Sequence, residues 1–179
     1  MQKTLETERL RLELWKPRDA EALFAYAKNP NVGPNAGWKP HANVAESRAI
    51  IRQLFMKDIT WKIVYKETGE IIGSIGLEND KRRPGVKSKE LGYSLAEHMW
   101  GNGIMTEAAR AVLDYAYGEL GCKIVSIVTS PNNERSQGVI RKLGFTYEGH
   151  ERYVYKMYDG EVRDSLVYSM YPDEFYGKE

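Results

Sequence analysis

The sequence predicts a single α/β domain spanning residues 1–179, built on one mixed sheet of about seven strands with four helices on its two faces. Three observations support this fold class. The chain has 179 residues, which suffice for one sizeable core, whereas two domains would be crowded. The predicted elements follow the order β-α-α-β-β-β-α-β-α-β-β. The strand–helix–strand segment in the second half makes a parallel pair, because a crossover returns the chain in the same direction.

The first third of the chain combines a strand with two helices. Residues 9–15 alternate polar and apolar side chains, as a half-buried strand does. An apolar stripe from Ala20 to Ala27 predicts a helix with Asp19 as its N-cap. Residues 29–41 are dense in Pro, Gly and Asn and predict an ordered loop, and residues 44–57 form a second amphipathic pattern.

The middle of the chain predicts three antiparallel strands. Residues 61–65 and 71–77 are apolar runs separated by a turn at residues 67–70. A charged loop at residues 80–88 leads to a third strand at residues 89–95. This loop is most simply solvent-exposed, although its basic residues also suit contact with an acidic peptide or with ribosomal RNA.

The last third supplies the crossover and a final hairpin. Residues 104–120 place a continuous apolar stripe on one helix face, and residues 123–130 read as a buried strand. A short helix follows within residues 132–144, and residues 145–171 form a hairpin that turns at Asp159-Gly160.

Composition excludes several classes of function. Lys and Arg number 26 against 25 Asp and Glu, so the net charge of +1 gives no general attraction to DNA or to an anionic membrane. The single Cys122 excludes an internal disulfide, and the three scattered histidines (His41, His98, His150) do not have metal-ligand spacing. We expect no bound metal. The N-terminus has no apolar signal-peptide core, and no run approaches the roughly 18 apolar residues of a membrane span, so we expect a cytoplasmic protein.

The segment WGNGIMTEA, residues 100–108, is the strongest local signal of function. Its two glycines stand directly before a long helix, where backbone amides and the helix dipole favour a phosphate. A Walker loop is excluded because no Lys follows, and a dinucleotide fingerprint is weak because Thr106 stands where its third glycine belongs. Two interpretations of these residues remain: a site for the pyrophosphate of coenzyme A, and a plain turn.

The chain resembles the GCN5-related N-acetyltransferases (GNAT), and within them the branch that acetylates the N-termini of ribosomal proteins. That branch typically opens with TERLRLR, nearly as residues 7–12 do here, and carries the W-G-x-G-x-x-T-E-A loop. It then has N-x-x-S before a KLGF-x-x-EG segment, here residues 133–136 and 142–149. The motifs occur in order along essentially the whole chain. Met105 departs from the branch, which often has Ala there.

The resemblance implies a GNAT fold with a splayed parallel pair of strands. It also implies an acetyl-CoA-dependent enzyme whose donor is acetyl-CoA and whose acceptor is a primary amine, which attacks the thioester directly. The best candidate acceptor is the N-terminal α-amine of a protein such as a ribosomal protein. Two alternatives remain open. One is acetylation of a small molecule such as an antibiotic, a polyamine or an amino acid, and the other is a CoA-binding module without catalysis. A homodimer formed through the edge of the last hairpin is also possible.

The resemblance further suggests roles for individual residues. Glu90, in the strand before the glycine loop, is the candidate base, acting directly or through water, unless strand alternation points it away from the cleft. Ser136 is the candidate proton donor to sulfur, with Tyr147 and the other hairpin tyrosines as alternatives. Residues 32–41 form a candidate lip over the amine site, with Trp38 and His41 as candidate acceptor contacts. The residues expected to bind the coenzyme are Leu95, Trp100, Gly101, Asn102, Gly103, Ile104, Met105 and Asn133.

Overall fold

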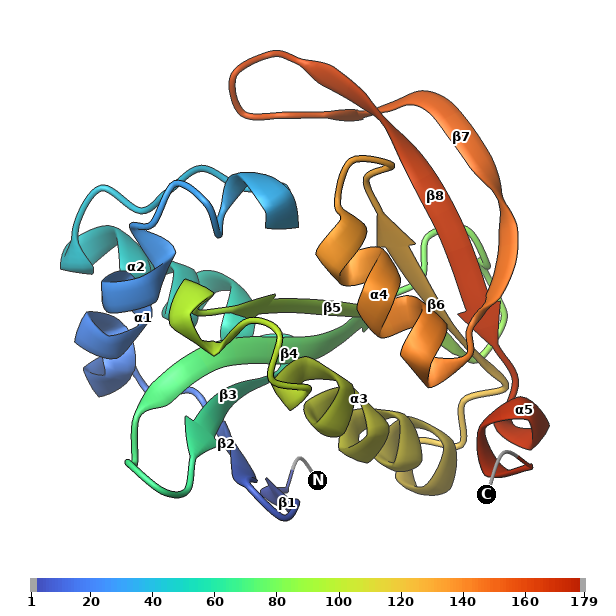
Figure 1. Cartoon of the computed structure of the whole chain (residues 1–179), viewed down its shortest axis with the longest axis horizontal. Coiled ribbons are helices and arrows are strands. Elements are labelled where there is room, and N and C mark those ends of the chain that lie inside the picture. Colours follow the sequence, from blue (N-terminus) through green and yellow to red (C-terminus); the bar gives the residue numbers. More distant parts are fainter. Residues whose placement is uncertain (1–2, 178–179) are drawn as a thin grey trace.

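The computed structural model describes residues 3–177 and contains one mixed sheet of eight strands within that range (Figure 1). The sheet order is β1-β2-β3-β4-β5-β6-β8-β7. Neighbouring strands are antiparallel except for β5 and β6, which run parallel. The strands are β1 (Leu5–Glu6), β2 (Leu10–Leu14), β3 (Ile59–Tyr65), β4 (Ile71–Asn79), β5 (Ser88–Leu95), β6 (Ile124–Thr129), β7 (Thr146–Lys156) and β8 (Val162–Met170).

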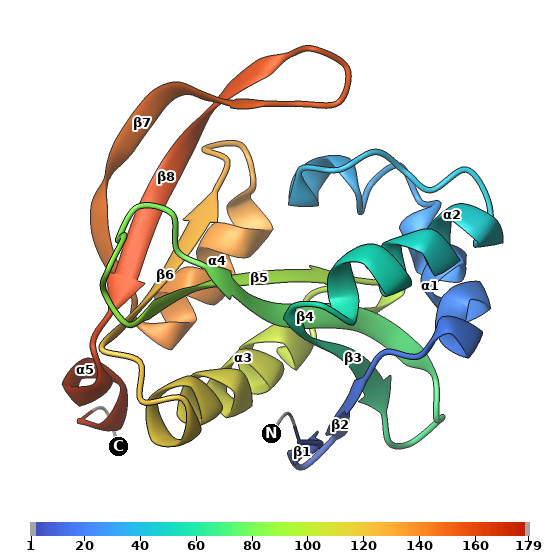
Figure 2. The same ribbon diagram turned by 180° about the vertical axis from the view of Figure 1, so that it is seen from behind.

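Five α-helices accompany the sheet in the described part of the chain, and they cover both of its faces (Figures 1 and 2). Helices α1 and α2 lie on one face, and α3 and α4 lie on the other. The helices are α1 (Ala20–Ala27), α2 (Val44–Ile50), α3 (Ile104–Asp114), α4 (Glu134–Leu143) and α5 (Pro172–Tyr176). The predicted fold class is therefore confirmed.

The structure adds two short elements to the predicted list. Strand β1 has only two residues, and helix α5 has five, so neither is long enough to give a periodic pattern in the sequence. Two predicted helices also end differently. Residues 51–55 after α2 and residues 115–119 after α3 continue as π-helical turns, a change of pitch that an apolar stripe does not reveal.

The main core lies between the sheet and helix α3. Trp61 and Ile63 from β3 and Ile75 from β4 are fully buried, and they belong to the same apolar cluster as Val112 and Leu113 of α3. A smaller core on the opposite face joins α1 and α2 to the sheet margin. The smaller core contacts the sheet through Ile71, the first residue of β4.

Strand β7 forms one edge of the sheet and extends with β8 into a long hairpin (Figure 1). Several of its aromatic side chains are exposed, including Tyr153 and Tyr155. Dimer formation through this edge stays a prediction. Among the described helices, none is both long and apolar enough to cross a bilayer.

Asp19 stands at the N-cap position of α1, as predicted, but its side chain makes no capping hydrogen bond. The Asp19 carboxylate instead accepts hydrogen bonds from the backbone amide of Lys16 at 2.8 Å and from Lys62 Nζ at 2.9 Å. The side chains of Lys62 and Asp19 are only 7% and 9% exposed, so this ion pair is buried. It fastens the start of α1 to the centre of β3.

We expect Lys62→Met to lower the free energy of unfolding by about 3 kcal/mol, because it leaves the buried Asp19 carboxylate without its cation. The matched control is Lys66→Met, which breaks the exposed pair with Glu6 and should cost less than about 1 kcal/mol. Urea denaturation of both variants measures the difference. Equal losses in the two variants would contradict a structural role for the buried pair.

Candidate active site

The parallel strands β5 and β6 separate part of the way along their length. They are paired at Ser88–Ile124, Lys89–Val125 and Glu90–Ser126, and at no later position. Beyond Glu90, β5 continues to Leu95 with only β4 as a partner. The facing strand edges therefore carry backbone amide and carbonyl groups that no sheet partner satisfies, which is the condition for binding an extended ligand as an added strand.

A cleft of about 790 Å³ opens where the two strands separate. Its wall combines strands β5 and β6 with the beginnings of α3 and α4, the tip region of the β7–β8 hairpin, and a turn between α1 and α2. Nine of the twelve sequence-predicted site residues line it. They are Glu90, Leu95, Trp100, Gly101, Gly103, Ile104, Met105, Asn133 and Ser136.

Three predicted residues do not line the cleft. The Asn102 side chain instead donates to the carbonyls of Met99 and Trp100 and so stabilises the loop from within. Trp38 packs against the smaller core, and its ring lies 5.1 Å from that of His41. The imidazole Nδ1 of His41 is 2.8 Å from the hydroxyl of Ser47. A role for Trp38 and His41 in binding the acceptor stays a prediction.

The glycine loop presents the start of α3 to the cleft. Gly101 and Gly103 have φ angles of +79° and +74°, a conformation that other residues adopt with strain. No side chain caps α3, so the amides of its first turn keep their hydrogen atoms directed outward. With the positive end of the helix dipole, these amides form an anion-binding site of the kind that a phosphate prefers.

The N-terminal segment holds this loop in place. Arg9 Nε lies 2.6 Å from Glu107 Oε2, and the Arg9 backbone amide donates to the other carboxylate oxygen at 2.9 Å. Arg9 also donates to the carbonyl of Asn102 at 3.0 Å, and Thr7 donates to Glu107. Burial acts to raise the pKa of Glu107, but these hydrogen bonds outweigh it and the pKa is lowered. Glu107 is therefore an anchor for the loop, and it does not line the cleft.

Trp100 joins the glycine loop to the neighbouring elements. Its indole Nε1 donates to the carbonyl of Leu95 at 2.9 Å, so this carbonyl already has a hydrogen-bond partner within the protein. The guanidinium of Arg135 stacks over the indole ring at 4.1 Å from the ring centroid. Because Arg135 and Trp100 both line the cleft, a positive charge stands beside the uncapped amides of α3.

The start of α4 contributes a buried hydroxyl. Asn133 Oδ1 accepts from the Ser136 amide at 3.1 Å, so its side chain caps α4, and its Nδ2 donates to the carbonyl of Asn35 at 3.1 Å. The Ser136 hydroxyl is 3.0 Å from the hydroxyl of Tyr93 on β5. Ser136 is 9% exposed. Both ends of the Asn133 amide are thus engaged before any ligand binds.

Glu90 stands at the last paired position before the strands separate. Burial raises the pKa of its carboxyl above the usual range, Asp80 and Glu78 add to this effect, and the positive charge of Arg82 opposes it. Arg82 Nη1 lies 3.1 Å from Glu90 Oε2. A carboxylate in such a position can accept a proton from a group bound in the cleft.

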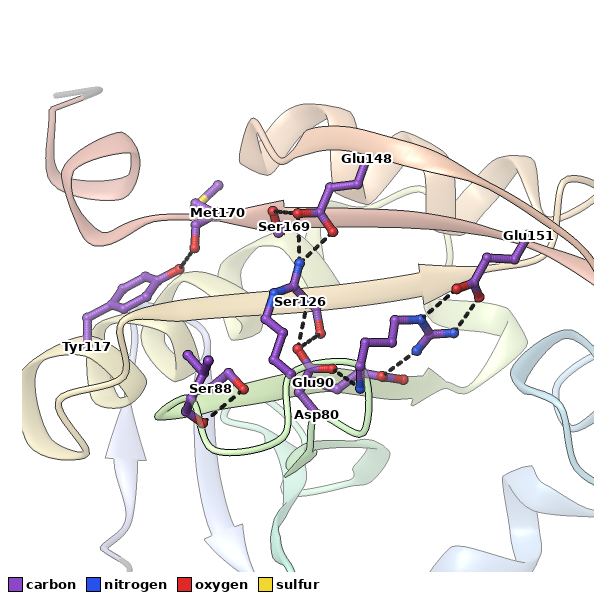
Figure 3. A network of polar contacts seen from close by, with 12 residues as sticks. Asp80, Ser88, Glu90, Tyr117, Ser126, Glu148, Glu151, Ser169 and Met170 are labelled. Atoms are coloured by element: carbon purple, nitrogen blue, oxygen red, sulfur yellow. Dashed lines mark hydrogen bonds and ion pairs between the residues drawn. The ribbon is translucent and has the colours of Figure 1, made fainter.

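The charged loop before β5 is tied into the protein (Figure 3). Arg82 binds Glu151 of β7 with two nitrogens, at 2.7 and 3.2 Å. Arg83 pairs with the fully buried carboxylate of Asp80 at 2.7 Å and also with Glu148. The sequence suggested that this loop is either solvent-exposed or free to contact an acidic partner. Both arginines are instead paired with carboxylates of the protein itself. They connect β4 and β5 to β7 across the end of the sheet.

Sequence reasoning missed one further part of the cleft wall, Tyr93. Its position shares the core-facing side of β5 with Leu91 and Leu95, where a tyrosine needs a polar partner, and this was the available signal.

The loop expected to form a lip over the acceptor does reach the cleft, but through residues 34–37 and not through Trp38 or His41. We call residues 34–37 the roof turn. Its carbonyls accept from Arg163 and Tyr155, each at 3.2 Å, and from Asn133. No local pattern in the sequence predicts these contacts between distant segments.

The described residues contain no group of three or more His, Cys, Asp or Glu side chains arranged to hold a metal ion. The residues on the cleft wall supply an anion site, a carboxylate base and a buried hydroxyl, with room between them for an extended ligand.

Comparison with known proteins gives a consistent result. The family model described as "Acetyltransferase (GNAT) domain" matches residues 9–146. The N-acetyltransferase YoaA of Bacillus subtilis (strain 168) is 31% identical over 172 residues, covering 93% of this chain and 95% of that protein. "Putative ribosomal N-acetyltransferase YdaF" of the same organism is 30% identical, covering 96% of each. The solved structure of Mycobacterium smegmatis RimJ in complex with CoA-disulfide has a TM-score of 0.80 at 22% identity, covering 97% of this chain and 89% of that one.

The matching model covers most of the chain, and the two relatives match it nearly from end to end. The chain belongs to the GNAT acetyltransferase family and is an acetyl-CoA-dependent N-acetyltransferase.

Proposed function

We propose that this enzyme transfers the acetyl group of acetyl-CoA to the α-amino group at the N-terminus of a protein, such as a ribosomal protein. The observation that carries the proposal is the single cleft. It brings together an uncapped helix start, two unpaired strand edges, the Glu90 carboxylate and the Ser136 hydroxyl. The similarity to YdaF, which is named as a ribosomal N-acetyltransferase, supports the choice of acceptor.

Acetyl-CoA spans the cleft in this proposal. Its diphosphate binds the first-turn amides of α3, whose backbone is shaped by Gly101 and Gly103. Its pantetheine arm enters the gap between β5 and β6 and hydrogen-bonds to the free strand edge. Arg135, stacked on Trp100, lies on the same wall and provides a cation for a further phosphate group.

Glu90 removes a proton from the acceptor amine. An N-terminal α-amine has a pKa of about 8 and a lysine side chain about 10.4, so the α-amine is deprotonated more easily near neutral pH. The raised pKa of Glu90 brings this base closer to the amine in proton affinity. The amine nitrogen then bonds to the thioester carbon and the carbon–sulfur bond breaks. The ammonium form loses two protons in all: one passes to Glu90 and then to water, and the equivalent of the other ends on sulfur.

Ser136 is the donor to the departing sulfur. It lies in the cleft wall in the first turn of α4, and its side chain is buried. The alternative donors in the hairpin are less well placed. Tyr147 does not line the cleft, and the Tyr155 hydroxyl already donates to the carbonyl of Gly37.

A small-molecule acceptor remains the second candidate function, because one observation is compatible with it. The roof turn is hydrogen-bonded to Tyr155 and Arg163 of the hairpin and to Asn133 of α4, so it bounds the cleft on the side opposite the glycine loop. A bounded acceptor side suits a compact amine. It also suits the first residue or two of a peptide, with the remaining chain outside.

The first prediction concerns the acceptor. In an assay of thiol release from acetyl-CoA, peptides with a free α-amine should react, because the lower pKa of that amine makes it the better nucleophile. The control is the same peptide with an acetylated N-terminus and one internal lysine, which should not react. If polyamines, amino acids or aminoglycosides release thiol and no peptide does, the alternative function replaces this proposal. If no thiol is released with any amine tested, the protein is a non-catalytic module.

The second prediction concerns pH. Arg82→Gln removes the positive charge that opposes the raised pKa of Glu90, so that pKa should rise further. Since protonated Glu90 cannot act as a base, the acidic limb of the kcat/KM profile should move to higher pH. The control is Arg11→Gln, which breaks an ion pair of the same 3.1 Å length far from the cleft. Glu90→Gln should lower kcat by about a hundredfold. An unmoved acidic limb in Arg82→Gln would count against Glu90 as the base.

The third prediction concerns the loop anchor. Glu107→Ala removes the contacts to Thr7 and Arg9, so the glycine loop should lose its fixed position. We expect KM for acetyl-CoA to rise about tenfold with a much smaller change in kcat. The loop would bind the diphosphate less well without its anchor, and a hydrogen bond to a charged group contributes about the free energy of a tenfold change in affinity. Glu8→Ala, an exposed neighbour, is the matched control. A loss confined to kcat would mean that Glu107 acts in the chemical step.

A further inference from the structure

The hydroxyls of Tyr93 and Ser136 meet inside the cleft wall. Tyr93 comes from β5 and Ser136 from the first turn of α4, two elements that face each other beyond the point where β5 and β6 separate. The two oxygens are 3.0 Å apart, and both residues line the cleft. The mechanism proposed above uses Ser136 but assigns nothing to Tyr93.

The direction of this hydrogen bond decides what Ser136 can do. If Ser136 donates to Tyr93, its only hydroxyl proton is used and the cleft faces oxygen lone pairs, which repel a developing thiolate. If Tyr93 donates to Ser136, the serine proton stays free for another acceptor. The alternatives therefore predict opposite effects on a sulfur that gains negative charge.

Two observations indicate that Tyr93 is the donor. The recorded partners of its hydroxyl are the Ser136 hydroxyl at 3.0 Å and the Ser136 carbonyl at 3.5 Å. If Ser136 donated to Tyr93, the single proton of Tyr93 would be left with the carbonyl at 3.5 Å, the outer limit of a hydrogen bond, whereas donation to the Ser136 hydroxyl uses the shorter contact. Burial raises the pKa of Tyr93 to about 12, which keeps that proton in place.

We propose that Tyr93 is a positioning residue that donates its hydrogen bond to Ser136 and thereby directs the serine proton to the thioester sulfur. This inference rests on the proposed function of Ser136. As the carbon–sulfur bond breaks, the sulfur takes the electron pair, and the Ser136 hydroxyl donates its proton to it. Ser136 recovers a proton from water after the thiol leaves, and Tyr93 keeps its own throughout. The contribution of Tyr93 is to orient and polarise Ser136.

The test compares four variants by steady-state kinetics at saturating amine. Ser136→Ala should lower kcat by about a hundredfold. Tyr93→Phe removes one hydrogen bond, so kcat should fall about tenfold while KM for acetyl-CoA stays within about twofold. The double variant should be no slower than Ser136→Ala within about twofold, because Tyr93 acts only through Ser136.

Tyr117→Phe is the matched control. The Tyr117 hydroxyl is also buried and donates to the carbonyl of Met170 at 2.8 Å, but it lies outside the cleft. This variant should keep the kcat of the unmodified enzyme. Thermal unfolding of all variants identifies any that have lost structure.

Independent effects of Tyr93→Phe and Ser136→Ala, which multiply in the double variant, would overturn the proposal. So would a rise in KM for acetyl-CoA without a fall in kcat, because that pattern indicates a packing role. The unmodified enzyme separates this failure from failure of the proposed function: if it releases no thiol with any amine, the proposed function itself is wrong.

Discussion

The end of pairing between β5 and β6 is the constraint on which the rest of the site depends. After Glu90 and Ser126 the strands have different partners, β4 for one and β8 for the other, and a gap opens inside an otherwise continuous sheet. Such a gap leaves backbone groups unsatisfied, and a protein keeps it open only if the two halves are supported separately. Helix α3 supports the first half, and the β7–β8 hairpin supports the second.

Charged side chains link the two halves without closing the gap. Arg82 and Arg83, in the loop before β5, form ion pairs with Glu151 and Glu148 of β7, respectively. The Asp80 carboxylate accepts a hydrogen bond from the hydroxyl of Ser126 on β6. These contacts lie at the paired end of β5, whereas the glycine loop and the roof turn lie along the open part. Glu90 stands between the two regions, so its protonation depends on the same arginine that joins the strands.

The sequence alone predicted the elements with strong local signals. Alternation in residues 9–15, the apolar stripe after Gly103, and the glycine-loop and N-x-x-S motifs were enough for the fold class and for nine residues of the cleft wall. The sequence did not predict contacts between partners distant in the chain. No local pattern reveals the pairing of Asp19 with Lys62, and the basic loop looked solvated because Glu148 and Glu151 lie some 65 residues away. The hydrogen bonds of Tyr93 and of the roof turn were not predicted for the same reason, although the loop that contains the roof turn was expected to flank the acceptor.

The cleft is assembled from two unequal parts of the chain, and this has an evolutionary consequence. In the proposed function, the coenzyme side is built from consecutive segments, β5 through α4, whose glycines, caps and anchors depend on one another. The proposed acceptor side is closed by the roof turn, whose carbonyls accept hydrogen bonds from Tyr155 and Arg163 of the hairpin. Carbonyl acceptors are present whatever side chain the residue carries, so Asn35 and Ala36 can change without breaking these contacts, whereas Gly37 is restricted by its positive φ and by the Tyr155 hydroxyl beside it. Under the proposed function, selection can thus diversify the accepted amine while leaving donor recognition intact.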